Sequence, residues 1–144
     1  MPSKNIGDRA IVIGGSIAGS LAARILSDYF EKVIIIDRDK FPDRPQTRKG
    51  VAQSVQPHIL LVRGYRILRE LFPGIEQKLL AKGALQIDWA REFSMFSESG
   101  WFANSVEPSE IISFTCSRPL LEWIIRDFIL EIDNIEIDVL NTSI

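Results

Sequence analysis

The sequence of 144 residues has little of several features that mark specialised classes of protein. A single cysteine, Cys116, cannot form an intramolecular disulfide, which excludes a disulfide-stabilised scaffold and favours the reducing cytoplasm. A net charge of −2 gives no support to nucleic-acid binding. Nine glycines and seven prolines are too few for a collagen-like or low-complexity chain. The remaining interpretation, with 46% apolar and 25% charged residues, is one ordinary soluble domain.

Long apolar runs are also absent from the sequence. The first apolar stretch covers only residues 10–13 before two glycines, which is too short for the apolar region of a signal peptide. The longest other run, residues 33–36, has the length of a strand, whereas a membrane-spanning helix needs roughly 20 apolar residues. We therefore expect no transmembrane segment and a cytoplasmic location.

The first 37 residues have the pattern of a strand, a tight turn, a helix and a second strand. Residues 9–13 and 33–37 are continuous apolar, β-branched runs, which are typical of buried strands whose two sheet faces are both covered. Between them, residues 16–30 carry apolar side chains at helical spacing. A parallel pairing of the two strands with a right-handed crossover is the expected arrangement.

The rest of the chain continues an α/β pattern with an interruption. Residues 38–57 are polar and rich in proline, which predicts a loop. Helices are predicted over 58–72, 75–82 and 118–132. Aromatic and β-branched segments within 86–96, 101–106 and 111–115 indicate a small antiparallel sheet beside the α/β layer. Alternation over 135–139 predicts a last strand, which we expect beside the first one.

A glycine-rich turn joins the first strand to the first helix. Gly14 permits the tight turn, and Gly19 allows the helix to pack against the sheet. Ser16 stands where the strict pattern has a second glycine, and its hydroxyl could donate to a phosphate. Asp37 ends the second strand, where a carboxylate can accept hydrogen bonds from ribose hydroxyls. The pattern predicts dinucleotide binding; the alternative is a non-binding turn in an α/β domain.

The segments after this turn carry a resemblance to a known family. The chain reads Arg48-Lys49-Gly50-Val51-Ala52-Gln53, then Leu71-Phe72-Pro73-Gly74, then Cys116-Ser117-Arg118-Pro119-Leu120-Leu121-Glu122. This series resembles the N-terminal, FAD-binding part of flavin-dependent monooxygenases of the aromatic hydroxylase superfamily. The branch nearest to it also resembles squalene epoxidases and flavin-dependent halogenases. The resemblance covers nearly the whole chain and implies a Rossmann-like, FAD/NAD(P)-binding α/β fold with a parallel sheet.

The resemblance also implies roles for individual residues. Asp37 would contact the adenosine ribose, and Arg38 would flank the adenine. Arg48 would face the phosphate and ribitol side of FAD, and Arg118 would also reach the cofactor. The pyrophosphate turn would consist of Gly14, Ser16, Ile17, Ala18 and Gly19. No catalytic residue and no metal ligand is assigned.

Implied domain boundaries follow the same resemblance. Residues 1–84 would be an FAD-binding segment, 85–116 an inserted part of a substrate domain, and 117–144 a return to the FAD-binding domain. Relatives carry an Asp-Gly motif and a later Gly-Asp motif that contact the flavin, and neither occurs at a matching position here. The fold is therefore expected to be incomplete at its C-terminal end.

The implied activity is that of a monooxygenase. It would use FAD, with NADH or NADPH as reductant, to insert one oxygen from O2 into a small apolar or aromatic organic substrate. Three alternatives stay open: a flavin halogenase, an isoprenoid-lipid reductase, and a non-catalytic fragment. The sequence does not choose the substrate, the nicotinamide cofactor or the oligomeric state.

Other conspicuous residues have a structural and a functional interpretation. His58 is structural or close to the cofactor rather than a general base, because no partner acid is indicated. Cys116 fits a small buried residue better than a reactive thiol. Arg118 could instead pair with Glu122 one turn later, and Arg44 could be a solvated loop residue. Five aromatic residues either line a substrate cavity or form the core of the inserted sheet: Trp89, Phe93, Phe96, Trp101 and Phe102.

Overall fold

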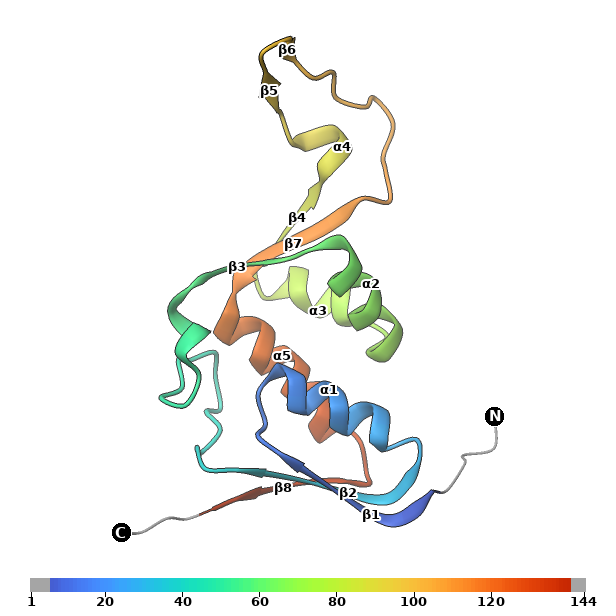
Figure 1. The fold of residues 1–144 in the computed structure, drawn as a ribbon, viewed down its shortest axis with the longest axis vertical. Coiled ribbons are helices and arrows are strands. Elements are labelled where there is room, and N and C mark those ends of the chain that lie inside the picture. The colour runs from blue at the N-terminus through green and yellow to red at the C-terminus, as the bar shows by residue number, and fades with distance from the viewer. Residues whose placement is uncertain (1–5, 141–144) are drawn as a thin grey trace. The chain divides into compact units, whose positions relative to one another are not determined.

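The chain forms two compact units in the computed structural model, which describes residues 6–140 (Figure 1). The first unit comprises the chain up to Gln56 together with the chain from Ser117 onward. The second unit is Pro57–Cys116. The assignment of residues 1–84 and 117–144 to FAD binding and of residues 85–116 to a substrate domain stays a prediction.

The first unit contains a parallel sheet of three strands in the order β1-β2-β8. Its elements are β1 (Gly7–Ile13), α1 (Ile17–Leu26), β2 (Phe30–Asp37), the short 3-10 helix η1 (Ala52–Val55), α5 (Arg118–Leu130) and β8 (Ile135–Val139). The predicted strand-turn-helix-strand pattern is confirmed, and so is the parallel pairing of β1 with β2. The predicted first helix stops early, because the chain turns after Leu26 and β2 already starts at Phe30.

The position of the last strand corrects one expectation. β8 pairs with β2 and not with β1, in a register that joins Val33 to Ile135 and Asp37 to Val139. The Asn134 carbonyl accepts a hydrogen bond from the Val33 amide, and the Leu140 amide donates to the Asp37 carbonyl. β2, the most apolar of the three strands, is therefore the central one.

The core of this unit lies on one face of the sheet. Helices α1 and α5 lie side by side over that face (Figure 1), where Val33, Ile35 and Ala23 are buried. On the other face, the Ile11 and Ile13 side chains are 62% and 88% exposed. The expectation of two covered faces is therefore wrong for the described residues, since both helices pack on the same side.

The second unit contains two small sheets and three helices. Its elements are β3 (Pro57–Leu60), α2 (Val62–Leu71), α3 (Ile75–Ala81), β4 (Leu85–Asp88), α4 (Trp89–Glu92), β5 (Phe96–Ser97), β6 (Gly100–Trp101) and β7 (Ile112–Ser117). One sheet has the order β3-β7-β4, and the other is the β5-β6 hairpin. The expected antiparallel pairing is confirmed for β4 with β7 and for β5 with β6.

Two boundaries in this unit differ from the sequence prediction. The helix predicted from residue 58 starts at Val62, because residues 57–60 form a strand of the β3-β7-β4 sheet. The segment predicted as a strand over 86–96 stops at Asp88. The Asp88 carboxylate accepts hydrogen bonds from the Ala90 amide and from the amide and hydroxyl of Ser109, which ends the strand and starts α4.

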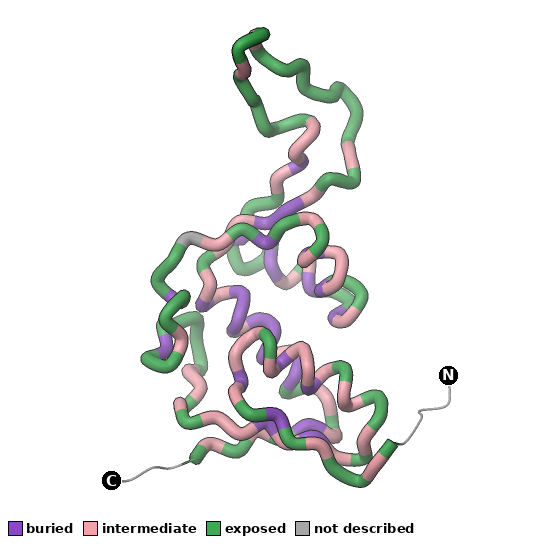
Figure 2. The backbone as a smooth tube through the Cα atoms, viewed as in Figure 1, coloured by how far each residue is buried: buried purple, intermediate pink, exposed green. Residues whose placement is uncertain are grey.

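Four of the five aromatic residues named above are exposed and do not form the core of the insertion, namely Phe93, Phe96, Trp101 and Phe102, and Trp89 is half-buried. Trp101 is 70% exposed, and most residues of the β5-β6 region have the colour of exposed residues in Figure 2. Most buried apolar side chains of this unit come instead from α2, the residue after it, α3 and β7, namely Tyr65, Leu68, Phe72, Ile75, Leu79 and Phe114. The interpretation of these aromatic residues as the core of the inserted sheet is therefore wrong. The interpretation that they line a substrate cavity stays a prediction.

The one-sided core yields a stability prediction. Ile35→Ala removes a side chain that is 1% exposed beneath the helices, so we expect it to lower the free energy of unfolding by about 2–5 kcal/mol. Ile11→Ala, on the neighbouring strand, should cost about 1 kcal/mol or less. Urea unfolding monitored by circular dichroism measures both. Equal losses for the two variants would contradict the assignment of the buried face.

Candidate functional site

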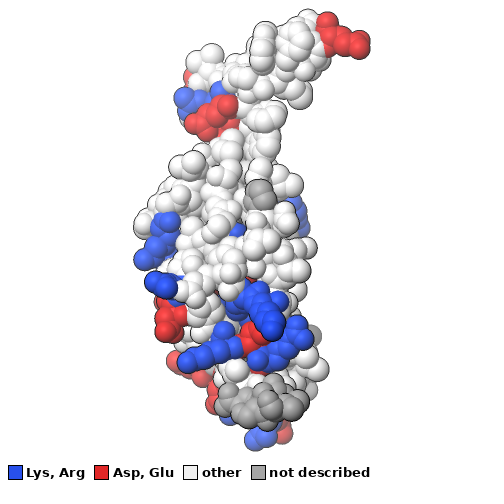
Figure 3. Space-filling view, turned by 90° about the vertical axis from the view of Figure 1, so that its left-hand side faces the viewer, with Lys and Arg blue, Asp and Glu red and all other residues white. Residues whose placement is uncertain are grey.

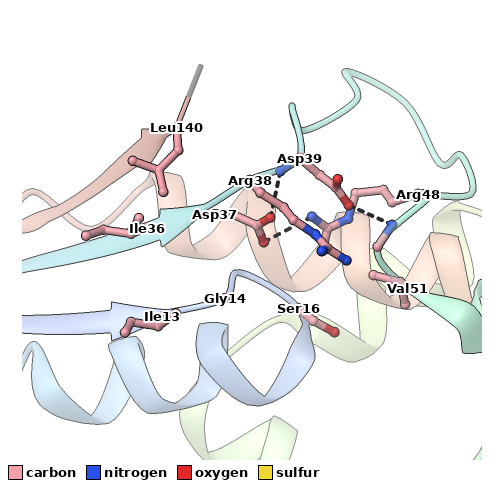
Figure 4. Close-up of a pocket in the computed structure, with 11 residues that line it drawn as sticks. Ile13, Gly14, Ser16, Ile36, Asp37, Arg38, Asp39, Arg48, Val51 and Leu140 are labelled. Carbon is pink, nitrogen blue, oxygen red and sulfur yellow. Dashed lines mark hydrogen bonds and ion pairs between the residues drawn. The ribbon is translucent and has the colours of Figure 1, made fainter. Parts of the chain in front are cut away.

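A pocket of about 310 Å³ opens at the carboxyl ends of the parallel strands (Figure 4). Ile13, Ile36 and Leu140 come from the ends of β1, β2 and β8. The loop after β2 supplies another part of the pocket wall, which includes Arg48 and Val51. Ligands of open α/β sheets bind outside the carboxyl ends of the strands, so this is the expected place for a site.

The glycine turn forms one side of this pocket. Gly14 has φ of +94°, a conformation that side chains with a Cβ rarely adopt, and no atom lies within 4 Å of the place where its Cβ would be. The Gly14 amide donates to the Ile36 carbonyl at 2.7 Å. A Cβ on Gly19 would overlap the Gly14 carbonyl oxygen, so the first turn of α1 packs directly on the glycine turn.

The N-terminus of α1 has no side-chain cap among the described residues. Ser16 is the N-cap, but its side chain makes no capping hydrogen bond within the part of the chain that is described. The amides of Ile17, Ala18 and Gly19 in this first turn have no partner further back in the helix. Together with the helix dipole they favour an anion at this point.

The Ser16 hydroxyl has a different partner from the one anticipated. It donates to Oε1 of Glu122 on α5 at 2.6 Å. In the structure its hydrogen is therefore committed to a carboxylate and is not directed at the pocket.

Asp37 ties the end of β2 to the glycine turn. Its carboxylate accepts hydrogen bonds from the Gly15 amide at 2.7 Å and from the Asp39 amide at 2.8 Å. Arg48 Nη1 lies 3.3 Å from the same carboxylate. Burial by itself raises the pKa of Asp37, but the two amides and the Arg48 guanidinium outweigh it and hold the pKa below its usual value. Asp37 is therefore ionised at neutral pH.

Arg48 is buried at the centre of the site, with 7% of its surface exposed. Its Nη2 donates to the Gly15 carbonyl at 3.4 Å, and its guanidinium lies 4.7 Å from the centre of the Phe41 ring. The side chain lines the pocket beside Asp37 (Figure 4). Its Nε is buried without a hydrogen-bond partner among the described residues.

Arg118 starts α5 and points toward the N-terminus of α1. Its Nη2 donates to the Ser16 hydroxyl oxygen and its Nη1 to Gln53 Oε1, both at 3.2 Å. Like that of Arg48, its Nε is buried and unpartnered within the described chain. Ser117 fixes the start of the helix, because its hydroxyl accepts a hydrogen bond from the Leu120 amide.

The loop after β2 brings further charge to the site. Arg38 is exposed and lines the pocket, and Asp39 accepts a hydrogen bond from the Gly50 amide at 2.8 Å. Figure 3 shows Lys and Arg side chains gathered on the face that carries this loop. The exposed cations of the loop are Arg38, Lys40, Arg44 and Lys49.

The structure thus brings the nominated residues together around one turn. Gly14, Ser16, Asp37, Arg38 and Arg48 line the pocket itself. Ile17, Ala18 and Gly19 form the adjoining turn of α1, and Arg118 reaches Ser16 from α5. Which of them bind a ligand stays a prediction.

Glu122 is the residue of this cluster that the sequence patterns missed. It is 5% exposed and contacts Ser16, Arg48 and Arg118. Its spacing of four residues from Arg118 indicated a local pair on one helix. The link to Ser16, 106 positions earlier, has no local signal.

Two other candidates lie in the second unit. His58 is half-buried in β3 and does not begin a helix. Cys116 is half-buried, and burial raises the pKa of its thiol, which disfavours the reactive thiolate. Among residues 6–140 no group of His, Cys, Asp and Glu side chains is suited to hold a metal ion. None of the helices in this range combines the length and apolar character that crossing a membrane requires.

The pKa of Asp37 leads to a prediction about pH. A carboxylate with a depressed folded-state pKa contributes stability that is present above its unfolded pKa, near 4, and is lost as the pH falls through its folded value. Asp37→Asn should therefore destabilise the chain at pH 7, and the difference from wild type should shrink below about pH 4. Urea unfolding at pH 7 and pH 3 measures this. Asp138→Asn, an exposed change on β8, is the control and should show no such convergence.

No family model matches the chain. "Protein Rv3254" of Mycobacterium tuberculosis is 34% identical over 132 residues, which cover 90% of this chain and 28% of that protein. The chain thus spans less than a third of the curated relative that it matches.

Two solved structures of flavin enzymes superpose on the chain. PqsL of Pseudomonas aeruginosa, described as a probable FAD-dependent monooxygenase, matches with a TM-score of 0.59 and 14% identity over 90% of this chain and 32% of its own. CmlS, a flavin-dependent halogenase, matches with a TM-score of 0.58 and 20% identity over 91% of this chain and 22% of its own. The chain therefore has the α/β fold that occurs in flavin-dependent monooxygenases and in a flavin-dependent halogenase, as the sequence resemblance predicted.

Proposed function

We propose that this chain is the FAD-binding portion of a flavin-dependent oxidoreductase, and more specifically of a monooxygenase. The observation that carries the proposal is the open glycine turn at Gly14. It lies between the N-terminus of α1 and the ionised Asp37, in a fold shared with flavin enzymes. This combination offers a place for a diphosphate beside a place for a ribose.

The residues at the pocket fit such a cofactor chemically. Two buried arginine Nε–H groups lack partners among the described residues: that of Arg48, which lines the pocket, and that of Arg118, which contacts Ser16 of the pocket wall. An unpartnered buried donor is costly, and a phosphate oxygen is a suitable acceptor for it. Ile13, Ile36 and Leu140 supply apolar surface at the strand ends, which suits an aromatic base.

Each nominated residue has a defined task in this proposal. The amides of Ile17, Ala18 and Gly19 would bind the pyrophosphate, and the absence of a side chain at Gly14 would let the cofactor approach the backbone. Asp37 already accepts two amides, but a carboxylate has about four acceptor positions and can still accept ribose hydroxyls. Arg38, exposed at the rim, would flank the adenine. Ser16, Arg48 and Arg118 would orient the phosphates.

The reaction itself would belong to the flavin. When bound, FAD would supply the redox chemistry with O2 that transfers one oxygen atom to an organic substrate, with NADH or NADPH as reductant. The described residues would hold and orient the cofactor by its adenosine and diphosphate.

A small apolar or aromatic molecule is the proposed substrate. A pocket of about 360 Å³ in the second unit is lined by Trp89, Phe93, Met95 and Phe102, which supports an apolar ligand. PqsL has been crystallised with 2-aminobenzoylacetate, a small aromatic compound. We further propose a cytoplasmic protein without a nucleic-acid partner, in keeping with its single cysteine and its net charge of −2.

A halogenase is the second candidate, because the fold of CmlS is similar. An isoprenoid-lipid reductase and a non-catalytic fragment are further alternatives. For the monooxygenase we expect the protein that contains this chain to form a product heavier by one oxygen, with or without chloride or bromide. Mass spectrometry of the products, with NAD(P)H and O2 supplied, checks this. A halogenated product that appears only with halide would favour the second candidate.

Cofactor binding itself is tested at the glycine turn. Gly14→Val places a β-branched side chain at a φ of +94°, on the side from which the phosphates would approach. We expect FAD binding to weaken by more than tenfold, a change of at least ~1.4 kcal/mol in binding free energy. Flavin fluorescence and the flavin content of the purified protein measure it.

Gly74 provides a matched control for this variant. It has nearly the same φ, +91°, and equally open surroundings, but it begins α3 in the second unit. Gly74→Val should therefore introduce similar backbone strain and leave flavin binding unchanged. Unchanged flavin content in the Gly14→Val protein would sink the proposed function.

A further inference from the structure

Glu122 connects three segments that lie far apart in the sequence. Its Oε1 accepts the Ser16 hydroxyl at 2.6 Å, and it lies 3.7 Å from Nη2 of Arg48 and 3.7 Å from Nη2 of Arg118. One carboxylate oxygen thus faces the capping residue of α1 and two guanidinium groups. The side chain is 5% exposed, so these groups and not water surround it.

Two carboxylates compensate the arginines of this cluster, and a further buried cation, Arg126, lies within electrostatic range of Arg48 and Glu122. Arg48 and Arg118 are cations with 4% and 11% of their side chains exposed. Asp37 compensates Arg48 from one side, and Glu122 lies near both arginines. Buried charges without counter-ions are strongly unfavourable, so Glu122 allows two arginines to be buried beside a positive helix terminus.

The ion pairs of Glu122 are nevertheless loose. Both arginine distances, 3.7 Å, exceed the 2.7–2.9 Å of a charge-assisted hydrogen bond. The Nε–H groups of both arginines remain unpartnered within residues 6–140. The carboxylate therefore compensates the charge of the two guanidinium groups without accepting a short hydrogen bond from either of them, while their Nη atoms donate to other groups of the chain.

We propose that Glu122 is an internal counter-anion, which stabilises the ligand-free site and limits its affinity for a diphosphate. The proposal rests on the assignment of the site to a diphosphate-containing cofactor. In the ligand-free chain Glu122 supplies the negative charge that the two arginines and the α1 N-terminus require. When a diphosphate binds, Glu122 adds repulsion, so that binding is weaker than the arginines alone would make it. Glu122 is thus a positioning residue that sets affinity.

Glu122→Gln removes the negative charge of the side chain and keeps nearly the same size and shape. The amide oxygen can still accept the Ser16 hydroxyl, while the negative charge disappears. We expect a lower melting temperature without ligand, because two buried arginines lose a counter-ion. We also expect inorganic pyrophosphate to bind about tenfold more tightly. The corresponding change in binding free energy lies between the interaction of one nearby charge in water and the same interaction at a protein surface. A merely structural residue would lower the melting temperature without raising this affinity.

The experiment compares the protein that contains this chain and its variants by thermal unfolding and by calorimetric titration with inorganic pyrophosphate, ADP and FAD. Glu136→Gln, an exposed carboxylate on β8 that pairs with Lys32, controls for net charge and should behave as wild type. Glu122→Asp keeps the charge and should retain the weak pyrophosphate binding of wild type. If Glu122→Gln does not fold alone, we expect pyrophosphate to restore its folding.

The outcomes separate this inference from the proposed function. Pyrophosphate binding by Glu122→Gln that equals or falls below that of wild type overturns the inference, as does a variant that stays unfolded at saturating pyrophosphate. A protein that contains this chain and binds no FAD, while its Glu122→Gln variant gains affinity for pyrophosphate, contradicts FAD as the cofactor and supports the counter-anion role.

Discussion

The candidate site depends on the carboxylate of Asp37. This one group accepts the Gly15 amide from the turn after β1 and the Asp39 amide from its own loop, and it pairs with Arg48 from the far end of that loop. Three segments are joined at the point where β2 ends. Since a buried carboxylate must be compensated, the turn, the loop and the arginine are bound to one another by the same requirement.

The elements nearest this carboxylate could be predicted from local patterns. The strand-turn-helix-strand order follows from two apolar runs, a glycine pair and helical spacing, and β8 was predicted with its observed bounds. The glycine turn could also be predicted, because a positive φ at Gly14 and the close approach at Gly19 are requirements that few residues other than glycine meet. In each case the sequence pattern and the structural feature that it produces lie within a few residues of each other.

Features that depend on distant partners could not be predicted in the same way. The Ser16 hydroxyl donates to Glu122, and β8 joins β2 and not β1, because the tertiary structure decides both. The strand at residues 57–60 has a sequence that also suits a helix, and its place in the β3-β7-β4 sheet decides between them. The exposed aromatic residues of the insertion show that side-chain type alone does not indicate burial.

The glycine turn has a consequence for how a ligand binds. Its conformation is held by hydrogen bonds internal to the chain, from the Gly14 amide to the Ile36 carbonyl and from the Gly15 amide to Asp37. A ligand that binds there does not have to order the backbone, so little conformational entropy is lost on association. Association should then be fast, and differences in affinity among related ligands should appear mainly as differences in residence time.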